Sequence, residues 1–135
     1  MLWSGNIFTP RDAARMLGET GCDGALVARG AFGNPWIFED IDRYFRTGEG
    51  APQRTLAEKC AVLRRHIEYI DRLNDSRGKI GVMRKVIIWY LKSFPSARRL
   101  RGDIALVKQY EDVLRFIDRM ELAGSHDLCE TAAKP

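Results

Sequence analysis

The first part of the chain contains two short apolar runs, separated by a segment with helical spacing. Residues 23–28 (Asp-Gly-Ala-Leu-Val-Ala) contain an apolar run without alternation, which is typical of a strand buried on both faces, and Leu2 and Trp3 could be the end of another strand. Between them, Thr9 can cap a helix and Asp12 can complete a capping box. We expect this helix to end near Gly21. The order strand, helix, strand predicts two parallel neighbouring strands.

A second helix follows the second apolar run, and a linker follows that helix. We expect Asn34 and Pro35 to begin the helix and Gly48 to end it. Residues 48–52 read Gly-Glu-Gly-Ala-Pro, which is typical of a linker. One face of this helix carries the apolar residues Ile37, Ile41, Tyr44 and Phe45.

Beyond the linker, the apolar pattern is helical throughout. Thr55 and Glu58 have the spacing of a capping box, and three apolar stripes follow. We expect Pro95 to end the second helix, residues 97–101 to form a turn, and the last helix to end near Gly124. The stripes are Leu56, Cys60, Leu63, Ile67 and Ile70; Ile80, Met83, Ile87, Tyr90 and Phe94; and Val107, Tyr110, Leu114 and Ile117.

These elements predict a mainly α fold class with a small β-α-β-α piece. The piece occupies residues 1–47, an all-helical bundle domain occupies residues 53–124, and residues 125–135 form a flexible tail. Two parallel strands leave both sheet edges unpaired and cannot bury both faces. We therefore expect further strands upstream, as in a larger α/β fold, or self-association through the unpaired edges.

Composition favours a globular chain without disulfides. Of the 135 residues, 45% are hydrophobic and 30% are charged. No window approaches the roughly 18 apolar residues of a membrane span, and no signal peptide is visible, so we expect no membrane contact and a cytoplasmic location. Cys22, Cys60 and Cys129 are odd in number and far apart, which argues against disulfides and a zinc site.

Positive charge is concentrated in one segment. The net charge is +4, and residues 77–101 contain eight Lys or Arg residues but no Asp or Glu. Cations gathered on one side of a helix can neutralise nucleic-acid phosphates, whereas a solvated face is the alternative interpretation. Trp89 lies off the apolar stripe and could stack on a base. The candidate RNA-binding residues are Arg77, Arg84, Lys85, Trp89, Lys92, Arg98 and Arg101.

Two turns at the expected strand ends form a second candidate site. Because the ends of adjacent parallel strands share one rim, residues 4–6 and residues 28–30 should face the same ligand. Backbone N–H groups, a helix N-terminus and an arginine can bind a phosphate there. The alternative is that the glycines only permit tight turns. The candidate residues are Ser4, Gly5, Asn6, Ala28, Arg29 and Gly30.

The residue pattern offers no catalytic residue and no metal ligand. His66 and His126 have no partner at the spacing of a triad or a metal site, so we treat both as solvated or structural. Cys22 precedes the second strand, at the end opposite the phosphate rim, and we interpret it as a packing residue.

Short motifs in both parts of the chain point to one family. They are residues 4–10 (Ser-Gly-Asn-Ile-Phe-Thr-Pro), 20–24 (Thr-Gly-Cys-Asp-Gly), 29–38 (Arg-Gly-Ala-Phe-Gly-Asn-Pro-Trp-Ile-Phe), 83–85 (Met-Arg-Lys) and 89–92 (Trp-Tyr-Leu-Lys). On these motifs, the chain resembles the C-terminal part of bacterial tRNA-dihydrouridine synthases over nearly its whole length apart from the tail.

The resemblance implies an oxidoreductase that reduces uridine in tRNA to 5,6-dihydrouridine. It implies that residues 1–47 are the last strand-helix units of a barrel holding FMN, that NADPH is the reductant, and that residues 53–124 bind tRNA. The two turns would hold the FMN phosphate. The family's catalytic cysteine would lie upstream of this chain, so the resemblance also implies that the isolated chain is inactive.

The sequence departs from the family pattern at several positions. Ser4 and Asn6 stand where the family usually has Asn and Asp, Ala28 where it has Gly, and Val86 where it has His. These changes affect side-chain contacts, whereas backbone donors at the turns and the basic segment are retained. The alternative function is a stand-alone basic helical module that binds RNA or protein without catalysis.

Overall fold

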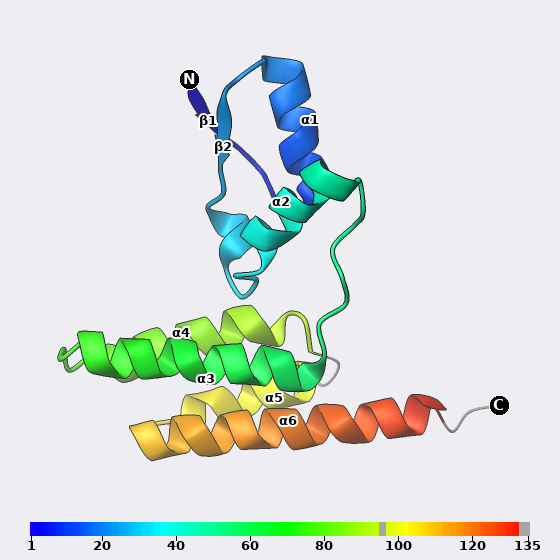
Figure 1. Ribbon diagram of the computed structural model, residues 1–135. Helices are drawn as coiled ribbons and strands as arrows, with labels where there is room; N and C mark the ends of the chain where they lie inside the picture. The colour runs from blue at the N-terminus through cyan, green and yellow to red at the C-terminus, as the bar shows by residue number, and fades with distance from the viewer. Residues whose placement is uncertain (95–96, 133–135) are drawn as a thin grey trace. The chain divides into compact units, whose positions relative to one another are not determined.

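The computed structural model describes residues 1–94 and 97–132, with side chains described as far as residue 123 (Figure 1). The chain divides into two units, Met1–Gln53 and Arg54–Pro135. The boundary between them falls at the end of the predicted linker. Each unit is described by itself below.

Two parallel strands and two helices make up the first unit. Strands β1 (Leu2–Ser4) and β2 (Gly24–Leu26) pair in parallel, with Ser4 opposite Leu26, which confirms the predicted pairing. Helix α1 (Pro10–Thr20) joins the strands and packs against α2 (Ile37–Thr47). Because the strands are parallel, the loops that follow β1 and β2 leave from the same end of the sheet.

Local signals explain where α1 begins and ends. The Thr9 hydroxyl accepts a hydrogen bond from the Asp12 backbone N–H, and the Asp12 carboxylate accepts one from the Thr9 N–H at 2.9 Å. The predicted capping box is therefore present. The helix ends at Gly21, whose φ of 63° is left-handed and favours glycine.

The loop between β2 and α2 differs from its prediction. Residues Arg29–Ala31 form the short 3-10 helix η1, and Gly33 follows with a φ of 74°. The prediction that Asn34 and Pro35 begin α2 is wrong, because the N-cap is Trp36 and no side chain caps the helix. The turn at Gly33 places Asn34 before the helix, where its N–H donates to the carbonyl of Ala31 at 3.1 Å.

Strand β2 is more exposed than the sequence predicted. Leu26 is 51% exposed, although the run at residues 23–28 predicted a strand buried on both faces, and Leu2 of β1 is 66% exposed. The buried apolar residues are instead Ile7, Ala13 and Ile37, from the loop after β1 and from the two helices. Burying both faces of a parallel sheet requires covering layers on both sides. Within the described residues, the sheet has only two strands, so each strand has an unpaired edge.

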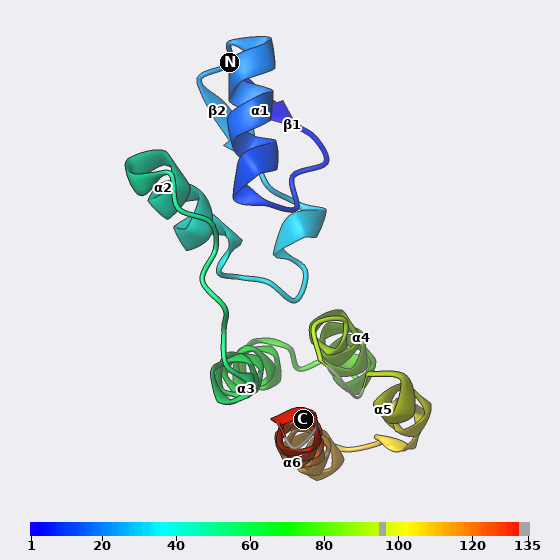
Figure 2. The same ribbon diagram turned by 90° about the vertical axis from the view of Figure 1, so that its right-hand side faces the viewer.

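The described part of the second unit is helical. It consists of α3 (Leu56–Leu73), α4 (Lys79–Leu91), α5 (Ala97–Asp103), the 3-10 helix η2 (Ile104–Leu106) and α6 (Tyr110–Ala132). Helix α4 packs against α3, α5 and α6, and α3 also packs against α6; Figure 2 views several of these helices nearly end-on. None of the described helices has the length and apolarity needed to cross a membrane.

Several element bounds in this unit differ from the predictions. Helix α4 ends at Leu91, and the predicted stop at Pro95 lies outside the described residues. The predicted turn at residues 97–101 belongs to α5, where arginine and leucine favour a helix. Helix α6 continues past Gly124 into the predicted tail, because one glycine costs only about 1 kcal/mol among helix-favouring Ala, Leu and Glu residues. Residues 133–135 lie outside the described residues.

The core of the second unit follows the predicted stripes of α3 and α4. The last predicted stripe is confirmed at Val107 and Ile117, which are buried, whereas Tyr110 and Leu114 are only half-buried. The buried stripe of α6 keeps Ile117 and has the same helical spacing, but it is shifted so that Phe116 and Met120 are inside. The buried residues of the three helices are Cys60, Leu63 and Ile67; Met83, Val86, Ile87, Tyr90 and Leu91; and Val113, Phe116, Ile117 and Met120.

Candidate functional site

The two predicted turns of the first unit lie against each other. The Arg29 guanidinium donates a hydrogen bond to the Asn6 side-chain oxygen, which joins the loop after β2 to the loop after β1. Both residues are exposed, as are Ser4, Gly5 and Ala28. The structure therefore brings the predicted rim residues together, with an arginine held at an exposed position.

Gly30 fixes the distance between these loops. It is buried, and a Cβ atom built on it would lie 1.9 Å from the backbone oxygen of Ile7. Only glycine lets η1 approach the Ile7 backbone this closely. Ile7 is itself buried in the core of the unit, so the position of Arg29 is tied to that core through Gly30.

Sequence reasoning missed one residue of this rim. The Arg29 guanidinium carbon lies 5.9 Å from the centre of the Phe8 ring, so the cation is stacked over an aromatic face. Phe8 follows the first turn by two residues, and its role depends on a contact between loops that sequence spacing does not reveal.

The rim has the chemistry of a phosphate-binding site. A guanidinium presents five N–H donors in a planar fork, so a hydrogen bond to Asn6 leaves other donors of Arg29 available to an anion. The first N–H groups of η1 also have no intrahelical acceptor, because 3-10 hydrogen bonds begin at a later residue. The residues present therefore fit a phosphate group.

The second candidate site is a face of α4 and its flanking residues. At 100° per residue, Arg84 and Lys85 differ by about 100°, and Lys92 falls within about 20° of Lys85. Arg77 lies in the turn that leads into the helix. Lys85 and Lys92 thus lie on the side of α4 opposite its buried stripe, Arg84 is half-buried at the edge of that side, and Arg77 precedes the helix. We call this surface the α4 basic face: Arg77, Arg84, Lys85 and Lys92.

The cations of the α4 basic face differ from other cations of the second unit because they form no ion pair among the described residues. Within the described residues, no carboxylate forms an ion pair with any of its four cations, nor with Arg98 or Arg101 of α5. Elsewhere cations are paired: Lys79 contacts Asp71 at 2.6 Å, and Arg64 contacts Asp118 at 2.7 Å. Positive charge is therefore left uncompensated at the predicted RNA-binding positions.

Trp89, the predicted base-stacking residue, is half-buried. It lies on α4 next to the α4 basic face, about 40° beyond Lys85. Two uncharged positions lie within that face: Gly81, which is exposed, and Ile88, which is 38% exposed. The face therefore combines charge with apolar surface.

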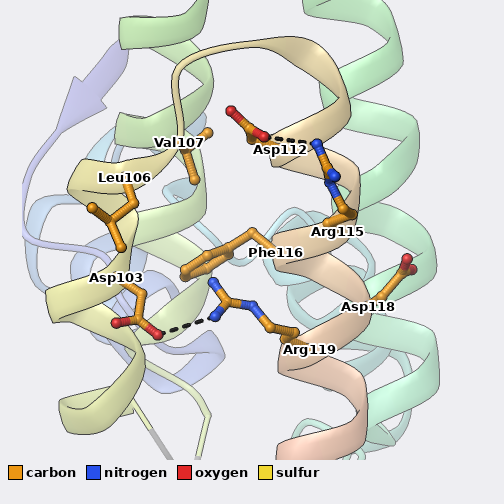
Figure 3. A pocket seen from close by; sticks show the side chains of 8 residues that line it. All are labelled: Asp103, Leu106, Val107, Asp112, Arg115, Phe116, Asp118 and Arg119. Atoms are coloured by element: carbon orange, nitrogen blue, oxygen red, sulfur yellow. Dashed lines mark hydrogen bonds and ion pairs between the residues drawn. The ribbon is translucent and has the colours of Figure 1, made fainter.

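A hollow of about 440 Å³ lies between η2 and α6, and its arginines are paired with carboxylates, unlike the cations of the α4 basic face (Figure 3). Its Arg119 pairs with Asp103 at 3.2 Å, and its Arg115 pairs with Asp112 at 2.9 Å. Figure 3 shows both pairs as dashed lines at the wall of the hollow. Because each arginine already has a carboxylate partner, this hollow is a poor site for an anion.

The remaining titratable candidates show no catalytic arrangement among the described residues. Burial raises the pKa of the Cys60 thiol to about 11, which keeps it protonated and unreactive. Burial also lowers the pKa of His66, whose ring packs edge-on against Tyr90 at 6.1 Å. Cys22 lies before β2, at the end opposite Arg29. No cluster of described His, Cys, Asp or Glu residues could hold a metal ion, and the side chains of His126 and Cys129 lie outside the described residues.

The described residues thus form a phosphate-compatible rim on an α/β piece and, on a helical unit, a basic face whose cations have no carboxylate partner among them. The family model described as dihydrouridine synthase (Dus) matches residues 1–124. The chain therefore belongs to the dihydrouridine synthase family.

Curated relatives agree with this assignment. A probable tRNA-dihydrouridine synthase of Mycobacterium tuberculosis (strain H37Rv) is 36% identical over 123 residues, covering 90% of this chain and 31% of the relative. The tRNA-dihydrouridine synthase B of Pseudomonas aeruginosa is 37% identical over 99 residues, covering 73% and 30%. The probable tRNA-dihydrouridine synthase 1 of Synechocystis sp. is 32% identical over 116 residues, covering 86% and 32%. The chain thus spans about a third of the length of these relatives.

Proposed function

We propose that this chain is the C-terminal part of an FMN-dependent tRNA-dihydrouridine synthase, supplying part of the FMN phosphate site and the tRNA-binding helical domain. Residues 1–47 would be the last strand-helix units of the flavin-holding barrel, and residues 53–124 the RNA-binding domain. The observation that carries the proposal is the α4 basic face, whose cations have no carboxylate partner among the described residues.

Electrostatics favour a polyanion at this face. An ion pair with a phosphate releases condensed counterions, whereas an exposed cation paired within the protein gains little from a new partner. Six cations in and beside α4 and α5 have no carboxylate partner in the part of the chain that the structure describes, and their contacts with RNA would give a log–log salt slope of about −4 to −5. Because the relatives are named tRNA-dihydrouridine synthases, we propose that the polyanion is RNA. The proposed contacts are Arg77, Arg84, Lys85, Lys92, Arg98 and Arg101, with Trp89 stacking on a base or ribose.

The rim of the first unit would hold the phosphate of FMN. Arg29 would donate to the phosphate oxygens, while Asn6 and the Phe8 ring hold the guanidinium in place. Backbone N–H groups at Gly5, Ala28 and Gly30 would add donors, with Ser4 beside them. When bound, FMN supplies the hydride chemistry that reduces uracil, with NADPH as the source of electrons.

The 135 residues alone are proposed to be inactive in this reduction. Of the cysteines with described side chains, Cys60 is buried and Cys22 lies at the opposite end of β2 from the rim, so neither can act beside a flavin. A desalted mixture of chain and FMN should therefore retain no flavin absorbance, and stoichiometric retention would contradict the proposal. The unpaired edges of β1 and β2 make self-association the alternative role of the first unit, which light scattering would detect.

Charge reversal on α4 tests RNA binding directly. We expect Arg84→Glu with Lys85→Glu to weaken binding of a labelled tRNA transcript and to reduce the salt slope by about 1.5, the share of two phosphate contacts. The matched control is Arg115→Glu with Arg119→Glu, which changes net charge equally but removes cations that already have partners. Fluorescence anisotropy at several salt concentrations measures both, and circular dichroism checks folding. Equal losses in the two variants, or salt-independent binding, would contradict the proposal.

A further inference from the structure

Gly81 occupies a position in α4 that the fold itself does not explain. It is the third residue of α4, and glycine is less favourable than alanine in a helix. A Cβ atom built on it would meet no other atom within 4 Å, and it is exposed. Neither a positive φ nor a close neighbour in the folded chain therefore requires glycine here.

The surroundings of Gly81 are those of the α4 basic face. Residues three and four positions away are its neighbours on a helix surface. One turn later these are Arg84 and Lys85; on the other side, Gly78 is the N-cap of α4 and Arg77 lies in the turn just before it. Arg84 and Lys85 on one side, and Arg77 and a second glycine at the start of the helix, thus flank a point where α4 carries no side chain, and none of the three cations has a carboxylate partner among the described residues.

We propose that Gly81 is the point at which the sugar-phosphate backbone of the bound RNA lies closest to α4. The inference rests on the proposed function and adds the mode of contact. Without a Cβ, a phosphate can approach the helix backbone, and Arg77, Arg84 and Lys85 can reach its oxygens from both sides. RNA fits better than an acidic protein, because its phosphates form a continuous narrow ridge of charge, whereas carboxylates end flexible side chains.

This contact mode predicts that stability and affinity change in opposite directions. In Gly81→Ala, the new methyl group is accommodated in the free chain and favours the helix, so the thermal midpoint should rise by about 2–8 °C. The same methyl holds the RNA away by about one bond length, and losing one charge-assisted hydrogen bond weakens binding about tenfold. Gly81→Leu should bind more weakly still, since the loss grows with side-chain size.

The matched control is Gly18→Ala in α1, which replaces another exposed helical glycine with no neighbour within 4 Å. It should leave the affinity for the tRNA transcript unchanged. Anisotropy titrations of the 135-residue chain, with polyglutamate as a competing polyanion, measure these effects. If Gly81→Ala binds tRNA as tightly as the parent chain, or polyglutamate competes as well as unlabelled tRNA, the inference is wrong. If the Arg84 and Lys85 reversal still reduces tRNA binding in that case, only this inference is wrong. If that reversal has no effect either, the proposed function is wrong as well.

Discussion

Replacing Gly30 with alanine is the sharpest test of how the two rim loops are held together. The added Cβ would lie 1.9 Å from the Ile7 backbone oxygen, 3.0 Å from its carbonyl carbon and 3.2 Å from the Phe8 Cα. All three atoms are backbone, so no side chain can rotate away. The loops must separate by about 1.5 Å to restore an ordinary contact of 3.4 Å, and Ile7 is anchored in the core.

The cost of this separation can be compared with two milder substitutions. Overpacking against fixed atoms costs about 1–3 kcal/mol, and we expect Gly30→Ala to lie at the upper end. In Gly5→Ala, the Cβ would lie 2.3 Å from the terminal methyl of Met16, and in Gly24→Ala 2.8 Å from a terminal methyl of Leu2. Those groups end flexible side chains and can turn away. We therefore expect both variants to cost less than about 1 kcal/mol.

Hydrogen exchange read by mass spectrometry separates the two units of the chain. In Gly30→Ala, amides of β1, α1 and α2 should exchange about a hundredfold faster, while amides of α3 and α4 should be unchanged. Gly5→Ala and Gly24→Ala should stay within about fivefold of the parent chain. If Gly30→Ala exchanges like the parent, the loops are not in rigid contact, and the argument that Gly30 positions Arg29 is wrong.

Two further predictions concern titratable groups of α3. Burial raises the pKa of Cys60 to about 11, so a thiol reagent at pH 8 should label Cys22 well before Cys60. Cys60 should react only after denaturant is added, and peptide mapping measures the order of labelling. The Thr55 backbone N–H and hydroxyl donate to the Glu58 carboxylate and lower its pKa, so the unfolded chain binds more protons and stability should fall as pH drops below about 5. In Glu58→Ala, thermal midpoints should show a smaller decrease over the same range, and an identical decrease would contradict this.

Much of the local structure was predictable from the sequence because its signals act within a few residues. The capping boxes at Thr9 and Thr55 are both present, and Gly21 and Gly48 end their helices with left-handed φ values. A cap requires only a side chain and a backbone N–H three residues apart. The parallel pairing of the two short strands followed in the same way from one intervening helix.

Predictions failed where tertiary contacts decide. Two apolar stripes of α6 have helical spacing, and only packing against α3 and α4 selects the one that contains Phe116. Strand burial depends on layers that cover the sheet, which Leu26 lacks in this chain. The rim residues Asn6 and Arg29 could be named from sequence, but the Phe8 stacking could not, because it joins loops that are distant in sequence.

The distribution of acidic residues gives the strongest physical reason to regard the α4 basic face as functional. A carboxylate three or four residues from a helical cation stabilises the helix, and α6 uses this device between Asp112 and Arg115. The segment 77–101 contains no acidic residue, so its cations can be paired only by acids outside the segment. That happens for Lys79, which lies on a different side of α4 and contacts Asp71 of α3. A surface selected for solubility alone would gain from pairing the other cations in the same way. Among the described residues these cations have no carboxylate partner, which is the state expected of the polyanion-binding face that we propose.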